Sequence, residues 1–178
     1  MKSLKENFQK EHIVIIGSGI IGKFNALELS ELGFQITIVD PNPLQNSSNA
    51  ALGLLMGNMY QKRRGRSWDL RKQSIELWPR WITFLQKFNY ELNIEKPLIQ
   101  LTTNEEKFKK LEKFIYEIND ENLRILGRDS IFIKNINKTF QTKNIKGMIS
   151  LKDGRINALS LLQTLDKYLK HKKVNYLK

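Results

Sequence analysis

Two apolar runs near the start of the chain flank a segment with helical periodicity. The runs lie at 12–16 and 35–40 and are rich in β-branched residues. Strands that are apolar on both faces are typical of a buried parallel sheet. Between them, apolar residues recur at mixed helical spacings from Ile20 to Leu32, and Gly33 follows as a helix stop. The pattern predicts a compact β-α-β unit with a right-handed crossover.

A loop and an aromatic helix are predicted after this unit. Residues 41–55 combine Pro, Asn, Ser and Gly with small apolar residues, so we expect no regular strand there. Ser67 is expected to cap the next helix, and Pro79 is expected to kink or interrupt it. The apolar stripe of this helix is interpreted as core and consists of Ile75, Trp78, Trp81, Ile82, Leu85 and Phe88.

The second half of the chain alternates short strands and helices. Thr103 and Glu106 match a capping box, which predicts that a helix begins there. Asn157 is expected to open another helix that carries a leucine-rich face. The remaining predicted elements are strands at 97–101, 131–133, 147–151 and 174–177 and a turn at 153–155.

Three glycines with the spacing G-x-G-x-x-G join the first strand to the first helix. In a dinucleotide site, Gly17 permits the tight turn, Gly19 lets the backbone approach a pyrophosphate, and Gly22 lets the helix pack on the strand. The helix N-terminus would offer N–H groups and a positive dipole end to the phosphates. Asp40, 23 residues after Gly17, would accept hydrogen bonds from an adenosine ribose. We therefore predict dinucleotide binding rather than a purely structural glycine turn.

The glycine turn and the acid suit NAD and FAD equally well. In a simple nicotinamide-binding domain, the second strand normally leads into another helix and strand of the same sheet. Here Asp40 is followed by a polar turn and by SSNAALGLL at 47–55, whose small residues would let the backbone approach an extended ligand. This loop favours FAD, and an NAD-dependent dehydrogenase domain stays the alternative.

Composition narrows the chemistry further. The 178 residues include no cysteine, which excludes disulfides and cysteine nucleophiles, and the two histidines lie far apart, so we predict no metal site. The N-terminal segment lacks the apolar core of a signal peptide and no stretch is long enough to span a membrane, so a cytoplasmic location is expected.

The net charge of +12 raises the question of a nucleic-acid partner. No recognition motif accompanies this charge, and lysines are spread over most of the chain, so we predict no nucleic-acid binding. The densest basic cluster contains Arg63, Arg64 and Arg66. It could hold a substrate carboxylate, but we interpret it as a solvated loop.

The chain resembles the FAD-dependent D-amino-acid oxidase superfamily, and within it the glycine-oxidase-like branch. The motifs that carry the resemblance are the β-α-β segment IVIIGSGIIGKFNALELSELGFQITIVD, SSNAALGLL after it, and SIELWPRW at 74–81. PLIQLTTNEEKFKKLEKF at 97–114 is similar to the family's first substrate-domain strand and following helix. DGRINALSLLQTL at 153–165 resembles the segment that returns the chain to the flavin domain.

The resemblance implies an α/β fold, namely a Rossmann-like FAD-binding domain with a parallel sheet plus part of an inserted α+β substrate domain. Residues 1–90 would form the FAD-binding core and following helix, 91–152 a partial substrate-domain segment, and 153–178 the return helix and strand.

The resemblance also implies which residues contact the cofactor. Gly17, Ser18, Gly19, Ile20, Ile21 and Gly22 would surround the pyrophosphate, with Asp40 on the adenosine ribose and Pro41 beside it. Ser47 and Ser48 would contact the phosphates and the ribityl chain, although serine also favours turns and caps. Leu52, Gly53 and Leu54 would lie near the flavin ring.

The resemblance further implies oxidation of a C–N bond in a small amine or amino acid, with oxygen or another acceptor taking the electrons. Because the cofactor supplies the difficult chemistry, no protein base is required, and we assign no catalytic residue.

Members of the family are about twice as long as this chain, so we expect an N-terminal half without its C-terminal half. Such a chain would expose strand edges and apolar faces, bind FAD weakly and aggregate readily. A non-catalytic truncated remnant is therefore a further alternative.

Overall fold

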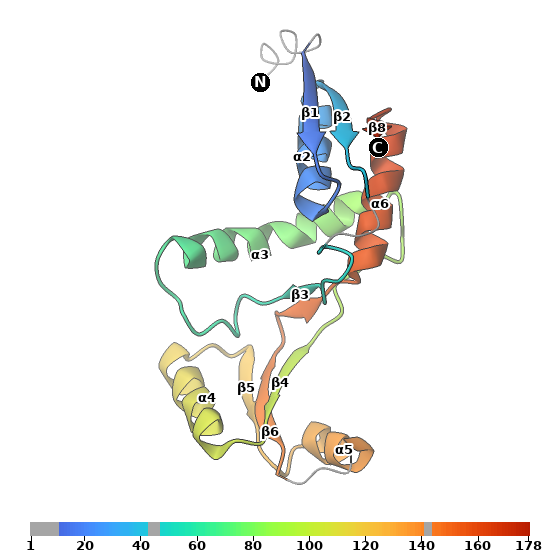
Figure 1. The fold of residues 1–178 in the computed structure, drawn as a ribbon. Helices are drawn as coiled ribbons and strands as arrows, with labels where there is room; N and C mark the ends of the chain where they lie inside the picture. The colour runs from blue at the N-terminus through green and yellow to red at the C-terminus, as the bar shows by residue number, and fades with distance from the viewer. Residues whose placement is uncertain (1–10, 43–46, 141–143) are drawn as a thin grey trace. The chain divides into compact units, whose positions relative to one another are not determined.

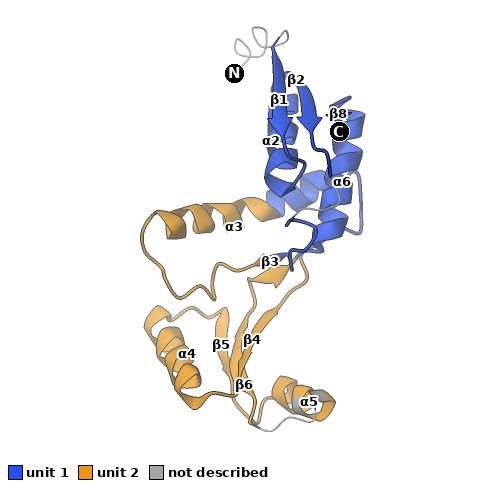
Figure 2. Cartoon of the chain, in the orientation of Figure 1, with its two compact units in different colours: residues 1–53, 79–93, 156–178 blue, residues 54–78, 94–155 orange. Residues whose placement is uncertain are grey.

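The computed structural model describes residues 11–42, 47–140 and 144–178. The described chain divides into two compact units (Figure 2). Unit 1 contains Met1–Gly53, Pro79–Asn93 and Ile156–Lys178, and unit 2 contains Leu54–Trp78 and Ile94–Arg155. Residues 54–78, which the sequence grouped with the first domain, thus lie in unit 2. The assignment of substrate-binding and flavin-binding roles to the domains stays a prediction.

Unit 1 is built on a parallel sheet. Its strands are β1 (His12–Ile16), β2 (Gln35–Val39) and β8 (Asn175–Leu177), in the order β1-β2-β8. The helices α2 (Ile20–Glu31) and α6 (Ala158–His171) pack against each other, as Figure 1 shows. The predicted β-α-β unit is therefore confirmed.

The core of unit 1 lies between the sheet and its helices. Ile38 of β2 and Leu165 of α6 are fully buried, and Tyr168 joins aromatic side chains of the 79–88 segment. Asn157 caps α6 by accepting a hydrogen bond from the N–H of Ser160, as its sequence position predicted. Burial and the hydrogen bond to Glu31 raise the pKa of Tyr168 well above its ordinary value, so its hydroxyl stays protonated.

One side of β1 remains open in the described part of the chain, where β2 is its only strand partner. Val14 is 55% exposed and Ile16 is 88% exposed, although both belong to an apolar run typical of a covered sheet. The exposed strand edge and apolar side chains that were expected from the sequence are thus present.

Unit 2 contains an antiparallel sheet with a helix on each face. Its strands are β4 (Leu98–Thr102), β5 (Leu123–Leu126) and β6 (Lys146–Ser150), in the order β4-β6-β5. Met148 of β6 packs with side chains of α4 (Glu105–Ile118), whereas its neighbour Ile149 packs with Ile133 of α5 (Ile131–Phe140). Successive strand residues face opposite ways, so the two helices cover opposite faces, as Figure 1 also shows.

The prediction of a strand at 131–133 is wrong, because these residues begin helix α5. Ile133 is fully buried and Ile136 packs against the same cluster, at a spacing of three residues that suits a helix. Three consecutive apolar residues do not distinguish a strand from a helix, and the pattern becomes helical only over ten residues. The strand β5 was not predicted.

Several predicted element ends also differ from the structure. Asn104, not Thr103, caps α4, because its side chain accepts the N–H of Lys107 at 2.9 Å. Helix α3 (Arg66–Leu85) begins one residue before the expected cap Ser67, and it continues through Pro79. The loop at 41–55 ends in β3 (Leu54–Leu55), which pairs with β7 (Gly154–Arg155) at the position of the predicted turn.

Candidate functional site

The glycine turn of unit 1 has the backbone geometry of a tight strand-to-helix connection. Gly17 has a φ of +99°, which favours glycine, and its N–H donates to the Val39 carbonyl at 2.8 Å. A Cβ added to Gly22 would lie 2.0 Å from the Gly17 carbonyl oxygen. Helix α2 can therefore pack this closely on the turn only because Gly22 lacks a side chain.

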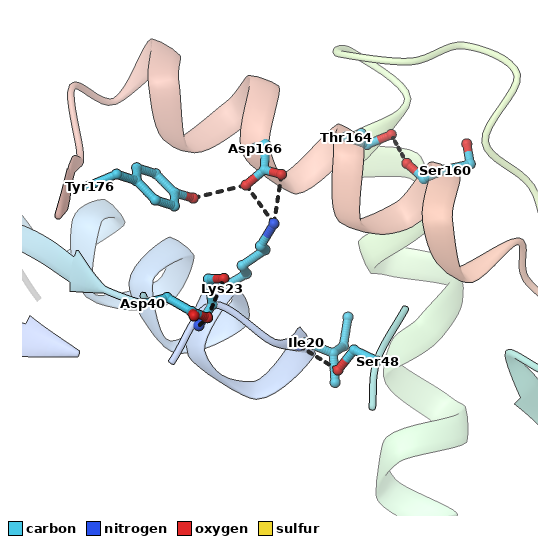
Figure 3. Close-up of polar contacts among 9 residues, drawn as sticks. Ile20, Lys23, Asp40, Ser48, Ser160, Thr164, Asp166 and Tyr176 are labelled. Atoms are coloured by element: carbon cyan, nitrogen blue, oxygen red, sulfur yellow. Dashed lines mark hydrogen bonds and ion pairs between the residues drawn. The ribbon is translucent and has the colours of Figure 1, made fainter. Parts of the chain in front are cut away.

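The N-terminus of α2 offers an environment that suits an anion. The helix begins at Ile20 after Gly19, and its first turn contains no acidic residue. The hydroxyl of Ser48 accepts the Ile20 N–H at 2.9 Å (Figure 3). Ser48 thus accepts an N–H of the first turn of α2 from a loop 28 residues later in the chain, while its own O–H remains able to donate to a ligand.

Asp40 points back at the glycine turn from the end of β2. Its Oδ2 atom accepts the backbone N–H of Ser18 at 2.7 Å and the Ser18 hydroxyl at 2.6 Å. Its Oδ1 atom accepts the N–H of Asn42 at 2.9 Å. The Ser18 hydrogen bonds, more than any other contact, hold the pKa of Asp40 below its ordinary value. The acid is therefore a carboxylate at neutral pH.

The structure brings together the turn at 17–22, Asp40 and Ser48, whereas several of the sequence-predicted residues are exposed. Pro41 and Ser47 are exposed. Ile21 is 75% exposed and Leu52 is 72% exposed. Their proposed contacts with the cofactor stay predictions.

Gly53 and Leu54 belong to different units. Gly53, with a φ of +70°, packs its backbone against Ile156 of unit 1 and accepts the Ile156 N–H at 2.9 Å. Leu54 lies in β3 of unit 2, opposite Arg155. Gly53 therefore holds the loop on the N-terminal end of the α6 segment.

Sequence reasoning missed an ion pair behind the glycine turn. Lys23 of α2 is 6% exposed, and its Nζ atom lies 2.6 Å from Asp166 of α6. The hydroxyl of Tyr176 donates to the same carboxylate at 2.9 Å (Figure 3). Burial, followed by the charge of Asp166, raises the pKa of Tyr176. Lys23 and Asp166 are 143 residues apart, so no local pattern predicts their contact. A lysine among the apolar residues of a helix does indicate that a buried charge needs an acidic partner.

The basic cluster after β3 was expected to be a solvated loop, and this is true of only two of its three arginines. Arg64 and Arg66 are exposed, whereas Arg63 is partly buried and its guanidinium lies 5.4 Å from the ring centroids of Trp68 and Phe114. In the described residues, no group of three or more possible ligands forms a metal site. Across the same residues, no helix combines the length and apolar character that crossing a membrane requires.

Three of the solved structures that share this fold are named as oxidases of amino compounds. Glycine oxidases from Bacillus cereus ATCC 14579 and Geobacillus kaustophilus each match with a TM-score of 0.75 and 21% identity over 95% of this chain. Iminodiacetate oxidase from Chelativorans sp. BNC1 matches with a TM-score of 0.74 and 18% identity over 92%. The matched parts are 46%, 47% and 45% of those chains respectively, so this chain spans about half their length.

Among curated protein sequences, nothing matches this chain. The family model described as "FAD dependent oxidoreductase" (DAO) matches residues 12–178, which include the glycine turn and Asp40. This match and the shared fold confirm the resemblance and the Rossmann-like fold with a parallel sheet that were stated from the sequence. The chain belongs to the DAO family of FAD-dependent oxidoreductases.

Proposed function

We propose that this chain binds FAD through unit 1 and that it serves in the oxidation of a C–N bond in a small amine or amino acid. Oxygen or another acceptor would take the electrons. The contact between Asp40 and the glycine turn carries the proposal. It places an ionised hydrogen-bond acceptor beside a turn whose glycines leave space that a side chain at Gly19 would occupy.

The residues of unit 1 fit the ADP half of FAD. The positive end of α2 and the Ser48 hydroxyl would hold the diphosphate, because the N–H groups of Gly17, Ser18 and Ile20 already donate within the chain. Asp40 would accept a hydrogen bond from the adenosine ribose. Three of its roughly four acceptor positions are already used, which leaves room for one ribose hydroxyl on Oδ1.

The charge of Asp40 also selects among dinucleotides. A carboxylate that stays ionised repels a 2′-phosphate, so NADP is disfavoured. NAD carries the same ADP half as FAD, and the loop at 47–55 supports FAD over NAD because it replaces the helix expected in a simple nicotinamide domain.

The names of the similar structures support an amine substrate. They include glycine, iminodiacetate and fructosyl peptide oxidases, an L-proline dehydrogenase and an L-amino acid deaminase, all named for compounds that contain a C–N bond. When bound, FAD would supply the electron-accepting chemistry, while the chain would bind and orient the cofactor.

Anaerobic reduction tests the proposed reaction. The FAD-loaded chain is mixed with glycine, sarcosine or iminodiacetate without oxygen, and the flavin absorbance at about 450 nm is followed. At least one amine is expected to bleach this band, whereas lactate, which has no C–N bond, is expected to leave it unchanged. An FAD-loaded chain that no amine reduces would contradict the proposed reaction without affecting the assignment of FAD binding.

Ser18→Ala is expected to weaken FAD binding by about 3- to 10-fold, because it removes one of the hydrogen bonds that orient Asp40. Isothermal titration calorimetry measures the change. Ser74→Ala removes the hydroxyl of an exposed helix residue and is the matched control, with no expected effect. Equal affinities of the two variants would show that Ser18 does not position the acid.

The same variant is expected to change the pH dependence of binding. The pKa of Asp40 is lowered in the folded protein, so its contribution is complete above the ordinary carboxyl pKa and is lost as the pH falls through the lowered value. In Ser18→Ala the pKa of Asp40 rises towards the ordinary carboxyl value, so the affinity should start to fall at a higher pH. Titration of the Asp40 carboxyl by NMR measures this shift, and an unchanged pKa would contradict it.

A further inference from the structure

Two arginines of unit 2 lie around one pair of aromatic rings. The rings of Tyr60 and Trp68 are stacked, with centroids 6.3 Å apart and an interplanar angle of 5°. The guanidinium of Arg71 lies 4.1 Å from the centroid of Tyr60, and that of Arg63 lies 5.4 Å from the centroid of Trp68. Both side chains are partly buried.

These arginines have hydrogen-bonding capacity that the structure does not use. Arg71 donates to the carbonyl of Met56 at 3.0 Å, and Arg63 donates to the carbonyl of Asn58. The Nε atoms of both arginines and the Nδ2 atom of Asn58 are buried, and within the described ranges none of them has a hydrogen-bond partner. Buried donors normally have acceptors, because an unmade hydrogen bond costs the energy of desolvation.

The positive charges of this cluster also lack a direct counter-ion. Among residues 11–42, 47–140 and 144–178, no carboxylate forms a salt bridge with Arg63 or Arg71. Asp153, between β6 and β7, is close to Asn58, but its carboxylate accepts the backbone N–H groups at 57–59. Asp120 interacts with Arg63 only through its charge and is hydrogen-bonded to Asn122. An anion is therefore the missing partner.

We propose that Arg63, Arg71 and Asn58 form a binding site for a small carboxylate. A flat, singly charged carboxylate matches the planar fork of a guanidinium and would supply the acceptors that the two Nε–H groups lack. The carboxylate of an amino-acid substrate and that of a free organic acid share this chemistry. The site uses no residue of the proposed FAD site and is a binding function of unit 2 in its own right.

NMR of the arginine side chains tests the proposal in the unmodified chain. The Nε–H signals are recorded while acetate, sarcosine or methylamine is added. Acetate is expected to give saturable shifts at Arg63 and Arg71 but not at the exposed Arg64 and Arg66, and methylamine is expected to give none. Sarcosine binding more tightly than acetate would identify an amino acid as the source, and weaker binding would identify a free acid. Equal, non-saturable shifts at all four arginines would overturn the proposal.

Lysine substitutions provide the matched variants. Arg63→Lys and Arg71→Lys keep the positive charge but remove the Nε–H donor, so each is expected to weaken acetate binding by at least about 10-fold. Arg64→Lys makes the same change at an exposed position and should bind acetate like the unmodified chain. Equal acetate affinity of Arg63→Lys, Arg71→Lys and Arg64→Lys would contradict the proposed carboxylate site. The FAD affinity of the same variants tests the proposed FAD site of unit 1 separately.

Discussion

Replacing Gly19 with valine is expected to weaken FAD binding by at least about 100-fold while the chain remains folded. A Cβ at this position would already lie 3.1 Å from the Ser48 hydroxyl, and the valine methyl groups would fill the space beside the N-terminus of α2. The hydroxyl of Ser48 can rotate, so the effect falls on ligand binding more than on folding. Flavin fluorescence measures the affinity, and circular dichroism checks the fold.

Gly127→Val is the matched control for this substitution. Gly127 lies in a turn of unit 2, and a Cβ added there would have no atom within 4 Å. This variant is expected to bind FAD like the unmodified chain. Unchanged FAD affinity in Gly19→Val would refute the assignment of the turn to the pyrophosphate.

Replacing Asp153 with asparagine is expected to lower the free energy of unfolding by about 3–5 kcal/mol. Asp153 is 1% exposed, and its carboxylate accepts the N–H groups of Gly57 at 2.8 Å, Asn58 at 2.9 Å and Met59 at 2.7 Å. Asparagine has the same shape but only one acceptor oxygen, and its NH₂ group would face a backbone donor. Urea denaturation followed by tryptophan fluorescence measures the loss.

Asp129→Asn makes the same chemical change at an exposed position and is the control. Its free energy of unfolding should stay within about 0.5 kcal/mol of that of the unmodified chain. If Asp153→Asn were equally mild, the carboxylate would not be what holds the segment at 57–59 in place.

The sequence predicted unit 1 well because its signals are local. The β-branched runs, the glycine spacing and Asp40 lie within 30 residues, and both strands match the structure to within one residue. The DAO family and the FAD cofactor of that family followed from these residues together with the loop at 47–55 and the later motifs, and both are confirmed. The position of Asp40 beside the turn was foreseen, the Ser18 hydroxyl as its partner was not, and its contact with the ribose stays a prediction.

The parts that could not be predicted depend on long-range contacts. Asp153 looked like an ordinary turn residue, because its three backbone partners lie more than 90 residues earlier in the chain. The pairing of Lys23 with Asp166 crosses 143 residues. Helix α5 was mistaken for a strand because the residues that bury Ile133 belong to β5, β6 and the segment before β6. Tertiary packing decided each of these cases.

Titration of the purified chain with FAD tests the central claim most directly. The account predicts saturable binding of one FAD per chain, with displacement by ADP but not by FMN, because unit 1 would hold the ADP half of the cofactor. Absence of saturable binding by both FAD and ADP would contradict the account.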